Sequence, residues 1–382
     1  MEQMNLNFDF RDIFRSPRLA LSGKKIWVFI IANFLSYLIY LILNYIALSL
    51  SGHSFIQTWN TQGLYPCLLI TGGPWYSLVL FWISILFWLY AIQLASTAVS
   101  RITYKQLKGD EFYSSNDSWN YVKKHWHAVI FTSVSLGLIT LFFVSISALF
   151  ALLGKIPFVG EFIFSIPYFL YFFGSIFTIY TGIVFLVSFI YSPSIIGTIE
   201  EDTMGSVFNN YSVTWGQPWR IIVYHSILIP LACFSVIIFK FISFYGIKLI
   251  NIVMGHEILM GSKLTDIIGV ASNIVWPQKL FTSMAENFTT CSLFCENTCN
   301  LGIHMNDFYN FFIPINSTNI SGSESIAAAI IGFFLLIISI SFLSYFLSIL
   351  SVGETIMFII FRKHSDDDNI LLHKDEEEFD AE

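Results

Sequence analysis

The sequence predicts an all-α protein, a polytopic transmembrane bundle of six helices with amphipathic helices at its interfaces. Three observations lead to this fold class. Of 382 residues, 55% are hydrophobic and only 12% are charged, whereas about a quarter of the residues in soluble domains are charged. Mean hydropathy is +0.68. Six separate apolar stretches are also present, each reaching the length of about 20 residues that crosses the hydrocarbon core as a helix.

Each predicted span must be helical, because backbone polar groups in lipid have to be bonded within the chain. The first apolar run follows five basic residues and is too long for the apolar core of a cleavable signal peptide, so we expect it to be retained. The predicted spans are Ile26–Leu50, Tyr76–Ser100, Ala128–Leu153, Ile166–Tyr191, Ile221–Ile250 and about Ile326–Leu350.

The positions of lysine and arginine predict the orientation, since cytoplasmic loops carry the excess of positive charge. One set of flanking segments holds 14 of the 19 basic residues, and the opposite set holds three. The sequence therefore predicts that both termini are cytoplasmic. The basic set is residues 1–25, 101–127, 192–220 and 362–382, and the other set is 51–75, 154–165 and 251–325.

Outside the spans, the chain divides by composition into several segments. Residues 1–25 predict a cytoplasmic interfacial segment, and residues 26–361 form the six-helix domain with an external loop at 251–324. Apolar residues at helical spacing within that loop, over His256–Trp276, predict an amphipathic helix on the outer leaflet. Residues 362–382 hold nine acidic residues against three basic ones, which predicts a disordered cytoplasmic tail.

The sixth apolar stretch continues to Phe361 and is longer than one crossing needs. About 36 helical residues would measure roughly 54 Å, against a hydrocarbon core of about 30 Å. We expect a break near Gly353–Glu354, with Ile356–Phe361 lying in the inner interface.

Four of the five cysteines fall in segments placed on the external side. Cysteines in an oxidising compartment predict two disulfides, with three pairings open. Free thiols are one alternative, and a metal site is another, although the Cys-x3-Cys-x3-Cys spacing is not a standard zinc pattern. The fifth, Cys233, falls inside a span and predicts packing. The disulfide candidates are Cys67, Cys291, Cys295 and Cys299.

Ionisable residues within spans are candidate functional groups, and this chain has few. Lys240, Lys248, Glu161, His225 and Glu354 all fall away from the predicted midplane. The remaining polar residues of the spans, chiefly Ser, Thr and Asn, predict interhelical hydrogen bonds.

The segment from Ser192 to Ile222 reads SPSIIGTIEEDTMGSVFNNYSVTWGQPWRII and predicts a surface helix capped by Asp202. Val207, Tyr211 and Trp215 recur at helical spacing and predict its apolar face. The segment combines a proline ending one span, an acidic pair, a small residue, a serine or asparagine, and a Trp-Arg pair starting the next span. The residues of this pattern are Pro193, Glu201, Asp202, Gly205, Ser206, Asn209, Trp219 and Arg220.

This pattern resembles a segment of bacterial six-span membrane proteins, a group that includes the membrane domain found beside glycerophosphodiester phosphodiesterases. The resemblance implies a compact six-helix bundle in a bacterial inner membrane. It does not imply phosphodiesterase activity, which in that group belongs to a separate soluble domain.

The leading functional hypothesis is a non-enzymatic structural or accessory membrane component, with no cofactor. Its expected partners are the lipid bilayer and a membrane protein or a second copy of the chain, and no basic patch predicts nucleic acid. The alternative is a transporter or lipid-handling permease. A third hypothesis is an enzyme with an interfacial site, and its candidate residues are His125, His127, Glu200 to Asp202 and Glu354. His125 and His127 also flank Trp126, and this arrangement predicts an interfacial anchor.

Overall fold

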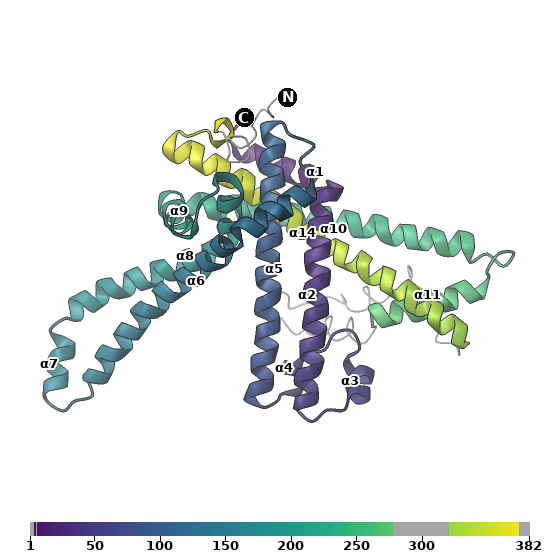
Figure 1. Cartoon of the computed structure of the whole chain (residues 1–382), viewed down its shortest axis with the longest axis horizontal. Coiled ribbons are helices and arrows are strands. Elements are labelled where there is room, and N and C mark those ends of the chain that lie inside the picture. The colour runs from purple at the N-terminus through teal and green to yellow at the C-terminus, as the bar shows by residue number, and fades with distance from the viewer. Residues whose placement is uncertain (1–3, 5, 278–320, 374–382) are drawn as a thin grey trace, which may run out of the picture. The chain divides into compact units, whose positions relative to one another are not determined.

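The computed structural model describes residue 4 and residues 6–277 and 321–373. Within these residues the chain is helical and contains no strand (Figure 1). Six helices are long and apolar enough to cross a membrane, which confirms the predicted all-α class and identifies an integral membrane protein. They are α2 (Gly23–Leu50), α5 (Trp75–Lys108), α6 (Ser115–Leu153), α8 (Tyr168–Ile199), α10 (Pro218–Met254) and α14 (Gly322–Asp366).

Shorter helices precede, separate and follow the spans. The predicted surface helix is present as α9, and the predicted amphipathic helix of the long loop is present as α11, with Leu264, Ile267 and Ile268 buried. The short elements are η1 (Phe10–Arg15), α1 (Ser16–Ala20), α3 (Phe55–Gln62), α4 (Leu68–Thr71), α7 (Val159–Ser165), α9 (Thr203–Gly216), α11 (Ser262–Val275) and η2 (Ile370–Leu372).

The chain divides into two compact units. The first unit comprises residues 1–32, 89–233 and 344–382, and the second comprises residues 33–88 and 234–343. In the first unit α6 and α8 run side by side, joined through α7, and α9 packs against both (Figure 1).

A seam of small hydroxyl side chains joins α5 to α14 in the first unit. The Ser96 hydroxyl donates to Ser351 Oγ at 3.0 Å, and the Thr355 hydroxyl donates to Ser100 Oγ at 3.0 Å. All four side chains are buried. Small hydroxyl residues let two helices approach closely and satisfy each other's polar atoms, as the sequence predicted for the polar residues of the spans.

In the second unit, tyrosines of α2 hold the segment that connects α3 to α4. The hydroxyls of Tyr37, Tyr40 and Tyr45 donate to the carbonyls of Leu64, Pro66 and Gly63 at 2.8, 2.8 and 2.6 Å. The Tyr65 hydroxyl donates to the Val275 carbonyl at 2.6 Å, which ties the same segment to the end of α11. Burial raises the pKa of the Tyr65 phenol above its usual value.

The predicted break near Gly353–Glu354 is wrong. The helix α14 continues without interruption through both residues to Asp366. The residues predicted for the inner interface, Ile356–Phe361, are instead almost completely buried in the first unit. The excess apolar length is accounted for by protein packing, since a helix that is apolar all round can form a buried core element.

The acidic segment after the sixth span is structured further than predicted. Residues 362–366 belong to α14, and η2 follows, with Ile370 and Leu371 buried. The Tyr104 hydroxyl donates to the Ile370 carbonyl at 3.1 Å, so the segment docks onto α5. The prediction of disorder is therefore wrong for residues 362–373, and residues 374–382 lie outside the described residues.

The predicted N-terminal interfacial segment contains two short helical pieces, η1 and α1. One face of these pieces is buried in the first unit, including Ile13, Leu19 and Ala20. The Ser348 hydroxyl donates to the Ala20 carbonyl at 3.2 Å, which fixes the end of α1 against α14. The segment therefore contributes to the core of the first unit as well as to its surface.

Candidate functional site

The surface helix α9 begins as the sequence predicted. Asp202 is its N-cap, and its carboxylate accepts a hydrogen bond from the Gly205 backbone N–H at 2.7 Å. Immediately before it, Glu200 closes α8 in the left-handed conformation at φ 56°. That conformation is uncommon for a residue with a side chain, and it turns the chain from α8 into α9 within three residues.

A buried ion pair fixes this turn to α5. The Arg101 guanidinium lies 2.6 Å from the Glu200 carboxylate, and the Arg101 side chain is 0% exposed. The same guanidinium sits over the rings of Tyr121 and Tyr104, at 4.4 and 5.7 Å from their centroids. The Tyr121 hydroxyl donates to the Ile196 carbonyl, so this ring also binds the last turn of α8. Three helices, α5, α6 and α8, and the turn that leads into α9 thereby meet around one charged group.

Glu201, Gly205 and Asn209 form a second set of contacts along α9. The Asn209 amide donates to Glu201 Oε1 at 3.4 Å and to the Gly205 carbonyl at 2.9 Å. Arg362 donates to Asn209 Oδ1 at 3.4 Å, which connects α9 to the end of α14. A side chain at Gly205 would collide with the Glu201 carboxylate, so glycine leaves room for this arrangement.

The buried face of α9 differs in part from the prediction. Val207 is buried as expected, but Trp215 is 77% exposed. The buried face is instead centred on Ser206 and Asn210, and the Asn210 amide donates to Ser192 Oγ at 3.0 Å. This face therefore packs on α8 through both a polar bond and apolar contacts, since Val207 lies with Val184 of α8 and Leu136 of α6.

Pro193 does not end the fourth span. It lies inside α8, which continues to Ile199. Ser192 to Thr198 are all buried, so protein contacts support the helix beyond the apolar run that the sequence identified.

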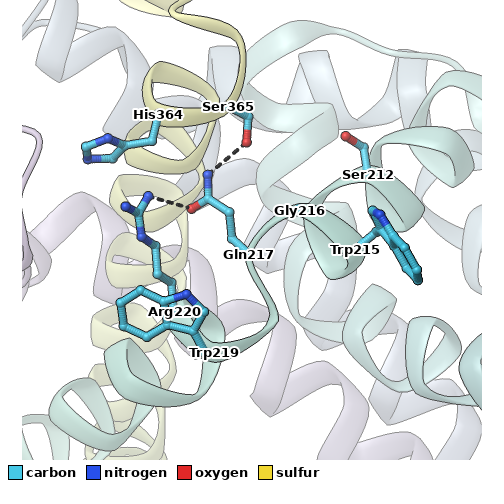
Figure 2. A pocket seen from close by; sticks show the side chains of 8 residues that line it. All are labelled: Ser212, Trp215, Gly216, Gln217, Trp219, Arg220, His364 and Ser365. Atoms are coloured by element: carbon cyan, nitrogen blue, oxygen red, sulfur yellow. Dashed lines mark hydrogen bonds between the residues drawn. The ribbon is translucent and has the colours of Figure 1, made fainter.

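Trp219 and Arg220, the last residues of the pattern, line a pocket of about 510 Å³ where α9 ends and α10 begins. Figure 2 shows Arg220 and Ser365 both hydrogen-bonded to Gln217: the Arg220 guanidinium donates to Gln217 Oε1 at 3.2 Å, and the Gln217 amide donates to Ser365 Oγ at 2.8 Å. The Arg220 guanidinium carbon also lies 5.7 Å from the Trp219 ring centroid. The structure thus brings Trp219 and Arg220 together with the end of α14.

The predicted disulfides stay a prediction. Cys67 is the N-cap of α4 and is a free thiol among the residues that the structure describes, as is Cys233, which is exposed and not packed as predicted. Cys291, Cys295 and Cys299 lie outside the described residues.

The groups considered for an enzyme have structural contacts. His125 stacks on Tyr121 with ring centroids 4.4 Å apart, and His127 lies against Trp126 at 4.4 Å. Glu200 pairs with Arg101, and Glu354 is buried in α14. Across residues 6–277 and 321–373, no three His, Cys, Asp or Glu side chains cluster as metal ligands would.

Sequence reasoning missed the role of Arg101. The predicted second span ended at Ser100, and Arg101 was counted with the cytoplasmic flank. In the structure α5 continues to Lys108 and Arg101 is fully buried. Arg101 directly follows the predicted span and is flanked by small and apolar residues, and this pattern could have indicated that the helix continues with the arginine buried.

The N-cap at Asp202 gives a direct test of this part of the site. We expect Asp202→Ala to lower the stability of α9 by about 1 kcal/mol, because the Gly205 N–H loses its acceptor. Asp202→Asn keeps a capping oxygen and should cost much less. Hydrogen exchange at the amides of residues 203–206 in detergent measures both. Equal effects of the two substitutions would show that the charge, and not the cap, stabilises the helix.

Comparison with known proteins adds no relative: the chain matches no protein-family model, no curated protein and no solved structure.

Proposed function

We propose that this integral membrane protein is a non-enzymatic structural or accessory component of a bacterial inner membrane, with both termini in the cytoplasm. The observation that carries the proposal is the ion pair of Arg101 with Glu200. This buried pair joins α5 to the turn before α9, and the Arg101 guanidinium also sits over the rings of Tyr121 and Tyr104. A buried ion pair between two helices fixes their relative position.

Other polar groups of the first unit support the same role. The hydroxyls of Ser96, Ser100, Ser351 and Thr355 bond to one another between α5 and α14. Such bonds fix helix register and make a rigid bundle. A rigid bundle presenting a surface helix suits a protein that positions a partner, which would be another membrane protein or a second copy of this chain.

The alternative is a lipid-handling permease. The observation that favours it is the pocket beside Trp219 and Arg220, which opens where spans α10 and α14 end. The resemblance of this segment to bacterial six-span membrane domains is compatible with either function, and membership of that group is part of the proposal.

Reconstitution separates the two functions. Purified protein is placed in liposomes that contain a fluorescent lipid in both leaflets and a trapped anionic dye. For an accessory protein we expect lipid exchange between leaflets, and dye leakage, at the rate of empty vesicles. Movement of either probe well above that rate, lost on heat inactivation, would overturn the proposal in favour of the permease.

A further inference from the structure

The pocket beside Arg220 lies where two candidate membrane-spanning helices have their ends, at the start of α10 and the end of α14. Its walls come from the end of α9, the first turn of α10 and the last turn of α14 (Figure 2). Since the candidate span α10 begins at Pro218 and the last turn of α14 carries the basic residues Lys363 and His364, we place the pocket in the interfacial layer of a bilayer. Lipid headgroups occupy this layer.

Arg220 sets the sign of the charge in this pocket. Its guanidinium contacts the Gln217 amide oxygen and the Trp219 ring, and no carboxylate among the described residues lies within ion-pair distance of it. A guanidinium carries five N–H donors in a planar fork that matches a phosphate. Most of these donors remain available to a ligand.

The acids on this side of the unit are occupied elsewhere or lie apart. Asp367 pairs with Lys363 at 2.8 Å, and this contact holds the pKa of the Asp367 carboxyl below its usual value. Asp368 pairs with Arg362 at 3.7 Å and with His373 at 2.9 Å. Asp9 and Arg220 both lie near Tyr224, and no ion pair joins them in the part of the chain that the structure describes.

The other walls suit the remainder of a lipid headgroup. Ser212 adds a hydroxyl, while His364 lies 3.0 Å from the Phe8 carbonyl oxygen and Ser365 accepts from Gln217. Trp215 and Trp219 are 77% and 62% exposed. Indole rings favour the boundary between headgroups and acyl chains. The volume of about 510 Å³ lies within the range of about 300–1,000 Å³ typical of small-molecule sites.

We propose that this pocket binds the phosphate group of an anionic phospholipid, with Arg220 as the principal donor and His364, Ser365 and Trp219 as its surroundings. The same phosphate chemistry is available from free phosphate in solution. The interfacial position and the exposed indoles favour the lipid. The inference goes beyond the structural role proposed above and does not depend on it.

The test measures lipid binding to the full-length protein in detergent. Native mass spectrometry follows the binding of phosphatidylglycerol, with phosphatidylcholine and inorganic phosphate as the other two probes. The variants are Arg220→Gln, which removes the charge, and Arg220→Lys, which keeps the charge without the fork. Arg18→Gln is the matched control, because Arg18 is an exposed arginine of the same unit outside the pocket.

We expect wild-type protein and Arg18→Gln to bind phosphatidylglycerol equally. Arg220→Gln should bind it about tenfold more weakly, and Arg220→Lys should lie between them. If inorganic phosphate displaces the lipid, and its own binding is weakened by Arg220→Gln in the same way, the pocket is a phosphate site whose ligand is soluble. Binding unchanged in Arg220→Gln, or weakened equally in Arg18→Gln, would overturn the proposal. If Arg220→Gln does not purify as a single species, Arg220→Lys provides the comparison, and binding by Arg220→Lys equal to that of Arg18→Gln would overturn the proposal.

Discussion

Substitution of Arg101 by methionine is expected to destabilise the first unit by about 3–5 kcal/mol, because it leaves the Glu200 carboxylate buried without its counter-charge. The Arg101 side chain also fills the space against the rings of Tyr104 and Tyr121, and it contributes packing there as well as charge. Thermal and denaturant unfolding in detergent, read from near-ultraviolet circular dichroism, measures the loss.

A double-mutant cycle separates the ion pair from the packing. Arg101→Met and Glu200→Gln should each be strongly destabilising, and the double variant should cost much less than their sum. Lys363→Gln is the matched control, since Lys363 pairs with Asp367 at 2.8 Å but the Asp367 side chain is 92% exposed. An exposed pair of this kind contributes about 0–1 kcal/mol. Additive losses in the cycle would show that Arg101 and Glu200 stabilise the unit independently.

The six spans could be predicted because a bilayer imposes a length and a hydropathy that a single sequence displays. The start of α9 could also be predicted, since capping by Asp202 depends on residues three positions apart. The amphipathic helix α11 was predicted for a related reason, as its apolar residues recur at the helical period. Each of these features is encoded locally.

The features that were missed depend on packing between distant segments. The sequence offers three consecutive acids, Glu200, Glu201 and Asp202, and nothing local indicates that only Glu200 meets Arg101. That choice follows from the left-handed turn at Glu200 and the position of α5. The predicted break in the sixth helix failed for the same reason. The break was predicted because the apolar stretch is longer than the hydrocarbon core of a bilayer is thick. The structure shows that the last part of this stretch, Ile356–Phe361, is covered by protein.

The closest approach of α5 and α8 leads to the second prediction of large effect. A Cβ built at Gly197 would lie 2.8 Å from Ser100 Cβ and 3.0 Å from the Thr97 carbonyl oxygen. Both neighbours are parts of α5 that cannot rotate away, so α5 and α8 would have to separate. We expect Gly197→Ala to destabilise the first unit by about 1–3 kcal/mol, which is typical of overpacked cores, and Gly197→Leu to prevent its folding.

Gly182→Ala is the matched control for this prediction, because Gly182 lies on the same helix and a Cβ there meets nothing within 4 Å. Its expected effect is neutral or stabilising by up to about 1 kcal/mol, from the higher helix propensity of alanine. Separation of α5 from α8 would also pull Arg101 from Glu200, since Gly197 is within one turn of the end of α8. We therefore expect Arg101→Met to add less destabilisation in the Gly197→Ala background than in the wild type. Equal stability of the Gly197→Ala and Gly182→Ala proteins would contradict the close approach of the two helices and, with it, the arrangement that buries the ion pair.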